Sequence, residues 1–518
     1  MADRNTSAIF GLSEMVLMER AALACVSVLT DRFMAGRDMS VSPLGVLIFA
    51  GSGGNGGDGI AVARLLHQRG CQVLLVTVGE IDRFSEIATK QLEIAMKYEV
   101  PMIRMREASE AEAVRIIAER RFDVIVDAIF GIGVSRPLSG VHAAAVAMIQ
   151  HLRSIEVGRP AVVSIDMPSG IHTDTGEVCG IAVQADLTVT MNHKKLGLVL
   201  YPGAVHAGEI VVADVGITAE SFADQAPAVR AYCENPSDLL PARNPAGNKG
   251  TFGKLLIVAG NTSIGGAPIL AARAAFAAGA GMVRVFTAAA NRIPLLNACP
   301  EALIDTWEET DEPAEVAAAL QRALAWSNAC VIGPGIGTGE TAACMLKTVL
   351  ENGSLPLIID ADGCNLIAED PWVREALKSY SQDGDIWPVL TPHPGEFAGL
   401  AGLENAQVRK NLLTAPKELA DELNCTVLCK DARSITAQAG EDAQILNLSG
   451  NCGMATAGSG DVLSGIAGAL ACAGMGAMET ASVAAYLHGL AGDRAAKNLG
   501  TRSMTAMDEV SGLRELLV

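Results

Sequence analysis

The chain repeats one pattern of apolar and polar positions: a short apolar run, a polar or glycine-rich turn, and then apolar residues at helical spacing. After a helix predicted over 13–35, the run at 45–50 leads through the glycine-rich segment 51–59 into a helical stretch at 60–69. Further strands are predicted at 73–78, 124–128, 161–166 and 186–191 in the first half, and at 254–259, 282–287, 330–333, 356–360 and 389–391 in the second. Strands that alternate with helices in this way predict the α/β class, with parallel sheets covered by helices.

The alternation stops between 218 and 248, where Pro227, Pro236, Pro241 and Pro245 occur among charged and small residues. Prolines at this spacing interrupt helices and strands, so this stretch is predicted to connect two domains. We therefore expect one domain over 1–222 and a second over 223–518.

Composition narrows the classes of partner. The chain has 518 residues, 50% of them hydrophobic but only 4% aromatic, so alanine and glycine must supply much of the packing. Its net charge of −19 argues against nucleic acid or an anionic membrane as a partner, although loop amides can still bind a small anion. The twelve cysteines form no CxxC pair, and Cys425 and Cys429 lack neighbouring zinc ligands. With no signal-like apolar core at the N-terminus, a cytoplasmic location is expected, and a homo-oligomer is expected too.

The segment 451–463, NCGMATAGSGDVL, is the strongest candidate for chemistry. Small residues lead into Asp461 and then into an apolar helical run, so free amides, the positive end of a helix dipole and one acid coincide. Such an arrangement suits phosphoryl transfer, in which the amides of Gly458, Ser459 and Gly460 hold phosphate charge while Asp461 takes a proton from a hydroxyl. The alternative is a glycine-rich turn in which Asp461 only caps the helix.

The first half contains a second glycine-rich turn, in which Gly51, Gly53 and Gly56 satisfy GxGxxG. A strand, a glycine loop and a helix in succession form the phosphate-binding unit of Rossmann-like doubly wound folds, and Glu80 lies where a ribose-binding acid would sit. A dinucleotide dehydrogenase is therefore one interpretation. The pattern arises easily in a glycine-rich loop, and a dehydrogenase does not require Asn55 and Asp58 within it.

Further polar residues follow the predicted strands of the first half. Asn55, Asp127 and Ser169 would converge, because ligands of an α/β sheet collect at the carboxyl ends of its strands. Oxygen ligands with one carboxylate suit a hard, weakly charged cation, although Asp127 and Ser169 are equally compatible with helix caps. Asp166 and Lys195 are candidates for an acid and base pair, or for an ion pair without a catalytic role.

Four motifs of the first half, GSGGNGGDG, VDAIFGIGVSRP, SIDMPSG and KLGL with YPG and GEIVVADVGI, resemble the epimerase domain of the NAD(P)H-hydrate repair enzymes, the YjeF N-terminal domain. The resemblance implies that a potassium ion is held by Asn55, Asp127 and Ser169 and that Asp166 contacts the substrate. The other implied contacts with the hydrated nucleotide are Gly54, Asn55, Gly56, Gly57, Asp58, Gly131, Ile132, Gly133, Val134, Ser135, Arg136 and Pro137. The family usually has Pro and Asn where this chain has Ser52 and Gly54.

Eight motifs of the second half resemble the ADP- or ATP-dependent NAD(P)H-hydrate dehydratases, enzymes with a ribokinase-like fold. They are FGKLLIVAG, GAPILAARAAFAAGAGMV, VIGPGIGTG, LIIDADGCNLIA, LTPHPGEFAGL, LCKDARSI, NCGMATAGSGDVLSGI and YLHGLAGD. The resemblance implies substrate contacts at Ala272, Gly335, His393 and Asp461, and an adenine nucleotide against Lys430, Asp431, Ala432, Arg433, Ser434 and Gly460. One departure is Ala457, where the family commonly has glycine.

Several roles in the second half stay open at this stage. His393 lies between two prolines with Glu396 close behind, which also suits a structural histidine. Asp360 and Asp362 of the DADG motif either orient a magnesium ion or a water, or cap the next helix.

Together the resemblances imply a fused repair enzyme. The first domain would interconvert the epimers of hydrated NADH or NADPH, and the second would dehydrate one of them with ADP, or ATP, and magnesium, giving AMP and phosphate when ADP is used. In this scheme Asp461 deprotonates the ring hydroxyl, which accepts the terminal phosphoryl group, and phosphate then leaves in place of hydroxide. Two alternatives stay open. The second domain could be a small-molecule kinase, such as a vitamin kinase, and the first domain could be a binding module without catalytic activity.

Overall fold

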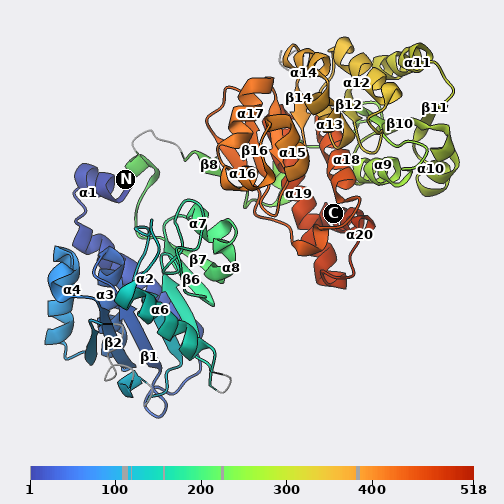
Figure 1. Cartoon of the computed structure of the whole chain (residues 1–518). Coiled ribbons are helices and arrows are strands. Elements are labelled where there is room, and N and C mark those ends of the chain that lie inside the picture. Colours follow the sequence, from blue (N-terminus) through green and yellow to red (C-terminus); the bar gives the residue numbers. More distant parts are fainter. Residues whose placement is uncertain are drawn as a thin grey trace. The chain divides into compact units, whose positions relative to one another are not determined.

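The computed structural model describes residues 2–107, 115–117, 120–155, 158–222, 227–380 and 386–517. The chain forms two compact units, Met1–Ala226 and Pro227–Val518 (Figure 1). Each unit contains a largely parallel sheet, which confirms the α/β prediction. The domain boundary predicted at 222–223 adjoins residues 223–226, which lie outside the described residues.

In the described part of the first unit, seven strands form one parallel sheet in the order β3-β2-β1-β4-β5-β6-β7. This order reverses direction at β1, as in doubly wound folds. The strands are β1 (Gly45–Ala50), β2 (Gln72–Val78), β3 (Met102–Met105), β4 (Val124–Ala128), β5 (Ala161–Ile165), β6 (Leu187–Met191) and β7 (Glu209–Ala213). The helices are α1 (Ala2–Phe10), α2 (Glu14–Phe33), α3 (Gly54–Gln68), α4 (Glu86–Lys97), α6 (Gly140–Arg153), α7 (Leu196–Val199) and α8 (Gly203–Ala207), with short 3-10 turns η1 (Ile81–Arg83) and η2 (Ala219–Phe222).

Both faces of this sheet are covered, which explains why its strands are largely apolar. Along β1, Ile48 belongs to the core that includes buried residues of α2, α3 and α4. Its neighbour Phe49 belongs to the core on the other face, with buried residues of α6. Alternate residues of a strand point to opposite faces, so a fully apolar strand is what a sheet between two helical layers requires.

In the described part of the second unit, ten strands form one sheet in the order β11-β10-β9-β12-β13-β14-β15-β16-β17-β8. The strands are β8 (Val229–Arg230), β9 (Lys254–Val258), β10 (Met282–Ala288), β11 (Leu303–Trp307), β12 (Ala329–Ile332), β13 (Leu357–Ile359), β14 (Pro388–Leu390), β15 (Thr426–Cys429), β16 (Ile435–Gln438) and β17 (Gln444–Leu446). The helices are α9 (Gly266–Ala277), α10 (Arg292–Ala298), α11 (Pro313–Trp326), α12 (Glu340–Asn352), α13 (Asp362–Glu369), α14 (Pro371–Lys378), α15 (Pro394–Ala401), α16 (Asn405–Lys410), α17 (Ala415–Leu423), α18 (Ser459–Cys472), α19 (Ala477–Leu499) and α20 (Ala506–Leu516), with 3-10 turns η3 (Pro236–Leu239), η4 (Ala289–Asn291) and η5 (Cys452–Met454). The strands from β11 to β15 are parallel, whereas β16 is antiparallel to both of its neighbours.

Small residues let the helices of the second unit pack closely, as the composition predicted. A Cβ atom on Gly465 of α18 would lie only 2.2 Å from the carbonyl oxygen of Ala271 in α9. The resulting core combines α9, α18, α19 and α20 with one face of the sheet. It holds α18, the helix that follows the glycine-rich motif, against the strands.

Several features differ from the sequence predictions. Strands β3, β7 and β11 were not among the predicted strands. The predicted connector contributes β8 to the second sheet, where it pairs with β17, and Tyr232 donates or accepts a hydrogen bond with Ser482 of α19. Helix α3 begins at Gly54 rather than at residue 60, and α18 begins at Ser459 rather than at residue 462. In both cases residues of the glycine-rich motif form the first turn of the helix, so the loop before it is shorter than predicted.

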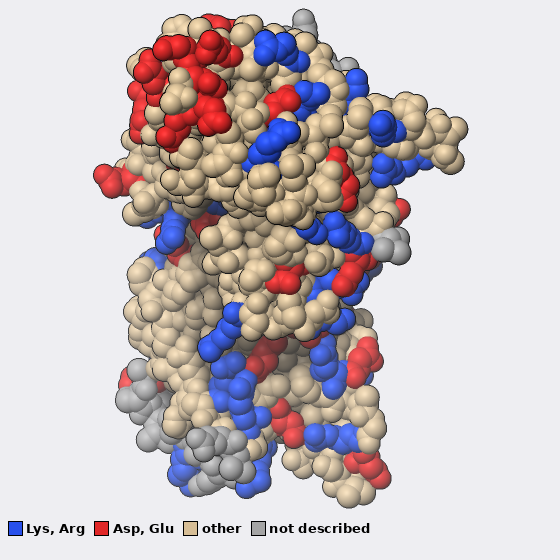
Figure 2. Space-filling view, turned by 90° about the vertical axis from the view of Figure 1, so that its right-hand side faces the viewer, with Lys and Arg blue, Asp and Glu red and all other residues tan. Residues whose placement is uncertain are grey.

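Charged side chains are unevenly distributed on the surface. On the face in Figure 2 one large group of acidic side chains forms a patch, while further acidic side chains and the Lys and Arg side chains are scattered. Over the described residues, no helix has the length and apolar character required to cross a lipid bilayer.

Candidate functional site

In the second unit, Gly458 begins the helix that carries Asp461. It is the N-cap of α18 and has a φ of +91°, which favours glycine, and a Cβ at this position would lie 2.4 Å from Leu270 Cδ1. The alternative in which Asp461 caps the helix is therefore wrong, because Asp461 is the third residue of the helix. The first amides of a helix have no partner within it, so Gly460 and Asp461 present their N–H groups at this end.

Two further strand ends bring charged groups to the first turn of α18. Asp360 follows β13 and Lys430 follows β15, and the Lys430 Nζ atom lies 2.5 Å from Asp360 Oδ1. Ser464 of α18 donates a hydrogen bond of 2.6 Å to the other carboxylate oxygen of Asp360. A Cβ on Gly460 would be 3.4 Å from Lys430 Nζ, so the ammonium group lies directly beside the helix start.

The same cluster controls the protonation of its acids. Burial raises the pKa of Asp461 to about 7, the Asp360 carboxylate adds to this shift, and Lys430 opposes it. Burial also raises the pKa of Glu396, with Lys430 lowering it and Asp360 raising it. Burial disfavours the charged form of Lys430, but Asp360 and Glu396 raise the pKa of its ammonium group overall. The raised pKa of Asp461 therefore lies near neutral pH.

His393 is an exposed capping residue. Its side chain is 58% exposed, and Nδ1 accepts hydrogen bonds from the N–H groups of Gly395 and Glu396 at the start of α15. Nε2 lies 3.2 Å from Glu396 Oε1. The structural alternative is wrong in the burial of the ring, but His393 does have a structural role as the hydrogen-bonded N-cap of α15. Its exposed ring also leaves a surface for a ligand.

The remaining residues predicted for this site differ in their accessibility. Gly335 has a φ of +65° and packs against Ile264, while Asp362 accepts a hydrogen bond of 2.8 Å from Gly337 N–H and so ties two loops together. Asp431, Ala432, Arg433 and Ser434 form the turn between β15 and β16, directly after Lys430. Ala272 is fully buried within the core. The structure brings the turn and Lys430 to one edge of the sheet, but it leaves no surface of Ala272 for a ligand.

In the first unit, packing accounts for most glycines of the GSGGNGGDG motif. A Cβ on Gly56 would lie 1.8 Å from the carbonyl oxygen of Gly51, and one on Gly57 would lie 2.5 Å from Met18 Cε. Both residues are buried, which argues against direct contact with a ligand through them. Gly53 and Gly54 have open space around them instead, so a ligand can approach the start of α3.

Asp127, at the end of β4, is the centre of a buried hydrogen-bond network. Its carboxylate accepts bonds from the Ser164 hydroxyl (2.9 Å), the Ser169 N–H (2.8 Å) and the Ser169 hydroxyl (2.6 Å). Burial raises the pKa of Asp127, and the hydrogen bonds from Ser169 and Ser164 lower it. The Ser169 hydroxyl also accepts a bond of 2.9 Å from Phe130 N–H, which fixes the segment that leads to Gly131.

Asn55 differs from these residues because its polar atoms have no partners. Both Oδ1 and Nδ2 are buried, and neither has a hydrogen-bond partner among the described residues. A Cβ on Gly131 would lie 3.3 Å from Asn55 Cγ and 3.3 Å from Asp166 Oδ2, so these three residues are neighbours. A buried amide without a partner is unfavourable and indicates a missing ligand. The oxygen donors at 55, 127 and 169 fit the potassium ion that the resemblance implies.

Asp166 and Lys195 form an ion pair at the ends of β5 and β6. The Lys195 ammonium donates to Asp166 Oδ1, to the Thr190 hydroxyl (3.0 Å) and to the Met191 carbonyl (2.9 Å). Their side chains are 14% and 19% exposed, and Asp166 has a φ of +66°. A strained backbone at a sheet edge is typical of functional sites.

The segment after Gly131 is mostly accessible. Ile132 is 60% exposed, whereas Val134 is buried. Gly133, Ser135, Arg136 and Pro137 are exposed. Asp58 lies in the second turn of α3. Apart from Val134, this segment can contact a ligand as the resemblance implies.

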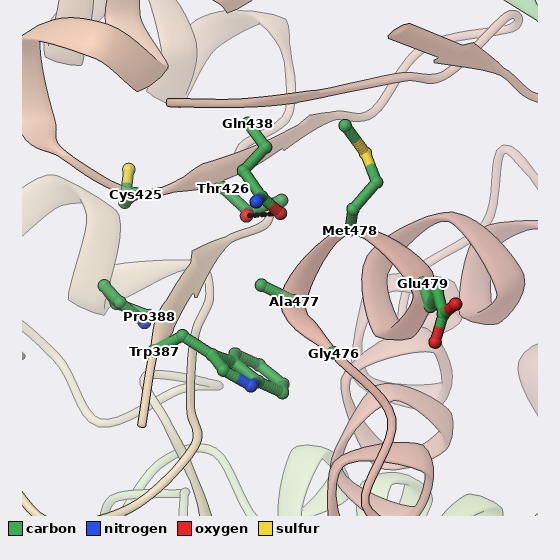
Figure 3. Close-up of a pocket in the computed structure, with 9 residues that line it drawn as sticks. All are labelled: Trp387, Pro388, Cys425, Thr426, Gln438, Gly476, Ala477, Met478 and Glu479. Atoms are coloured by element: carbon green, nitrogen blue, oxygen red, sulfur yellow. Dashed lines mark hydrogen bonds between the residues drawn. The ribbon is translucent and has the colours of Figure 1, made fainter. Parts of the chain in front are cut away.

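A cavity of about 270 Å³ lies elsewhere in the second unit (Figure 3). It is lined by the first residues of β14 and β15, by Trp387 and Gln438, and by the start of α19. The strands of this part of the sheet are parallel, so the cavity is at their amino ends, opposite Asp360 and Lys430. It is separate from the cluster around Asp461.

Asp360 and Glu396 are not among the residues that the sequence predicts for the site. The sequence suggests only that Asp360 caps a helix or binds magnesium. Its pairing with Lys430, seventy residues away, depends on the strand order. The signal that could have found it is the acid directly after a predicted strand.

Comparison with known proteins identifies both halves. The family described as YjeF-related protein N-terminus matches residues 14–197, and the NAD(P)H-hydrate dehydratase family matches residues 255–512. The bifunctional NAD(P)H-hydrate repair enzyme Nnr of Thermofilum pendens is 35% identical over 100% of this chain and 94% of its own length. The enzyme of the same name from Escherichia coli is 32% identical over 99% of this chain and 92% of its own length. Among solved structures, a ribokinase-like superfamily protein from Enterococcus faecalis is 28% identical, with 57% of this chain and 96% of that chain covered and a TM-score of 0.48.

Proposed function

The chain belongs to the family of bifunctional NAD(P)H-hydrate repair enzymes, and from this premise we propose that its two units act in turn on hydrated NADH and NADPH. The first unit interconverts the R and S epimers. The second dehydrates the S epimer with ADP as co-substrate and gives NAD(P)H, AMP and phosphate.

The start of α18 is the observation that carries this proposal. Asp461 is a largely buried acid with a pKa of about 7, next to free amides and to the Lys430 ammonium group. A base should have a pKa near the working pH, and preorganised amides stabilise the charge that develops on a transferred phosphoryl group. Both requirements are met within one helical turn.

The dehydration follows from these groups. Asp461 accepts the proton of the ring hydroxyl, whose oxygen attacks the terminal phosphorus of ADP, and the bond between that phosphorus and the bridging oxygen breaks to release AMP. The carbon–oxygen bond then breaks as the ring nitrogen donates its electron pair, and phosphate leaves with the former hydroxyl oxygen. Loss of a proton from the adjacent carbon restores the dihydropyridine. Phosphate is a much better leaving group than hydroxide, which is why a dehydratase consumes a nucleotide.

Several residues would hold the nucleotide and substrate. Lys430 and the turn 431–434 would contact the phosphates and the adenine nucleotide, with the amide of Gly460 on the transferred group. Magnesium would neutralise charge on the phosphates of ADP, or of ATP if it replaces ADP. His393 and Gly335 would contact the hydrated nicotinamide nucleotide.

In the first unit, Asp166 and Lys195 would move protons at the hydrated carbon of the ring, because they form a contiguous acid and base pair at the sheet edge. Potassium held by Asn55, Asp127 and Ser169 would supply positive charge for the nucleotide's phosphates. The orphaned amide of Asn55 supports this ligand set.

A cytoplasmic location is part of the proposal and is supported by the twelve cysteines, all of which are free thiols. The partners are small molecules rather than nucleic acid or membrane, and we keep a homo-oligomer as a prediction.

The alternative is a small-molecule kinase in the second unit, since the same base and amides would phosphorylate any positioned alcohol. The discriminating experiment uses NADH hydrated in acid, with the full chain, magnesium, potassium and either ADP or ATP. Recovery of NADH fluorescence from both epimers is expected. Recovery from one epimer only would remove the epimerase assignment, and a stable phosphorylated product would favour the kinase.

A further inference from the structure

The motif YLHGLAGD, residues 486–493 of α19, has no role in the reaction described above. Its side chains and backbone lie against the segment that precedes α18. The Ser449 hydroxyl donates to the Tyr486 carbonyl (2.9 Å), and a Cβ on Gly489 would lie 2.1 Å from Ser449 Oγ. The helix therefore needs glycine at 489 for this segment to approach.

The same helix holds both ends of the motif that contains Asp461. At one end, Asp493 accepts hydrogen bonds of 2.9 Å from the Gly450 N–H and from the Asn451 side-chain amide. At the other end, His488 Nε2 lies 3.2 Å from the hydroxyl of Ser459, the first residue of α18. Helix α19 thus holds both ends of the segment 450–459, through Asp493 at the start and His488 at the end.

His488 is itself held from behind by a buried carboxylate. Its Nε2 lies 2.9 Å from Oε2 of Glu509 on α20. Glu509 is fully buried, and its other oxygen, Oε1, has no hydrogen-bond partner among the described residues. Burying a carboxyl group with so few partners lowers the stability of the fold, which points to a role for Glu509 beside His488 that outweighs this cost.

We propose that His488, supported by Glu509, is a positioning residue for the dehydration, which fixes the first turn of α18 through Ser459 and so keeps Asp461 and the amide of Gly460 aligned with the transferred phosphoryl group. The inference rests on the proposed function of the second unit. His488 does not touch the reacting atoms, because it is buried behind Ser459. Both of its hydrogen bonds use the same ring nitrogen, so a hydroxyl-activating triad, which needs both nitrogens, is excluded.

Because His488 makes both contacts through Nε2, variants that do or do not place a nitrogen at that position test the proposal. A glutamine side chain can bring its amide nitrogen close to the position of imidazole Nε2, whereas an asparagine side chain reaches only the region of Nδ1. With the full chain, ADP and hydrated NADH, we expect His488→Asn to lower kcat about ten- to a hundred-fold with little change in KM for ADP, since small misplacement of catalytic groups is costly. We expect His488→Gln to restore kcat to within about three-fold of the unchanged protein.

The matched control is Thr480→Val, on the same helix. Thr480 is fully buried and its hydroxyl donates to the Met475 carbonyl, away from the loop. This variant should keep kcat unchanged even if its unfolding temperature falls. Equal kcat in His488→Asn and His488→Gln, whether unchanged or equally reduced, would overturn the inference. Failure of the unchanged protein to regenerate NADH would instead reject the proposed function.

Discussion

The two units use one device, a glycine-initiated helix, in two different ways. In the first unit α3 begins after Gly53, and its first turn carries Asn55, a neutral amide whose buried polar atoms have no partners among the described residues. In the second unit α18 begins after Gly458, and its first turn carries Asp461, an acid beside the Lys430 ammonium group. A helix start supplies amides for an anion in both cases. The side chain in the first turn then decides whether the helix start itself supplies a base, as Asp461 does, or leaves proton transfer to other residues, as proposed for Asp166 and Lys195 in the first unit.

The strongest test of this contrast removes the acid of α18. Asp461→Asn should lower the dehydration rate about 10³-fold, because a general base contributes 10²- to 10⁴-fold. Epimerisation by the first unit should be unaffected. The two rates are measured as NADH recovery and as the return of a purified epimer to the mixture of both. Near-normal NADH recovery in this variant would contradict the role of Asp461.

The reverse experiment acts on the first unit. Asp166→Asn should slow epimerisation about 10²-fold and leave dehydration of the S epimer intact. Asparagine tolerates the positive φ of +66° at this position, so the backbone should not change. Asp174→Asn, at an exposed position eight residues further along, is the control. If epimerisation continues at its normal rate, the first unit is a binding module or uses another base.

Asp461 should also affect stability. Its raised pKa means that the folded state binds the proton more tightly than the unfolded state, whose carboxyl titrates near 4. The corresponding stability is present below about pH 4 and is lost as the pH rises toward about 7. Asp461→Asn should therefore be more stable than the unchanged protein by up to about 4 kcal/mol at pH 8, since the pKa rises by about three units and each unit corresponds to about 1.4 kcal/mol, with the difference vanishing near pH 4. Denaturant unfolding at the two pH values tests this, and a loss of stability at pH 8 would contradict it.

The same pKa predicts the pH dependence of the reaction. Since Asp461 must be ionised to act as a base, kcat/KM for dehydration, which reports the ligand-free protein, should fall about ten-fold per pH unit below pH 7 and level off above it. The rate of NADH recovery with hydrated NADH and ADP both well below their KM gives the profile. A flat profile between pH 5.5 and about pH 8 would rule out a base with this pKa.

The smallest expected effect concerns Asn55. Potassium should raise the unfolding temperature of the unchanged protein relative to choline, because an ion bound only by the folded state stabilises it, here by about 1 kcal/mol. Asn55→Ala should remove this response. An equal response to potassium in both proteins would remove Asn55 from the ligand set.

The parts of the molecule that sequence could predict are those set by local patterns. Strands β1 and β4 occur at the predicted residues, and β9 agrees within one residue, because each contains a run of apolar residues that leads into a glycine-rich turn. Strand β8 was missed since its two residues pair only through the edge of the second sheet. Likewise the start of α3 depends on Gly56 packing against Gly51, a contact that the spacing alone does not reveal.

The candidate sites also divide into residues that local patterns predict and residues that only the packing of distant segments brings together. Asp461 and Asn55 could be predicted as candidates because motif and chemistry coincide within a few residues. The pairing of Lys430 with Asp360 requires the order β13-β14-β15, and His488 and Glu509 belong to two helices whose packing no local pattern specifies. The burial of Ala272 is a packing result of the same kind.

The most direct test of the account is the stoichiometry of the second reaction. Purified S-form hydrated NADH is mixed with the full chain, magnesium and limiting ADP, and NADH, AMP and inorganic phosphate are quantified at completion. One NADH, one AMP and one phosphate for each ADP consumed is the predicted result. NADH formed without ADP consumption, or AMP formed together with a stable phosphorylated nucleotide, would contradict phosphoryl-assisted loss of water at the start of α18.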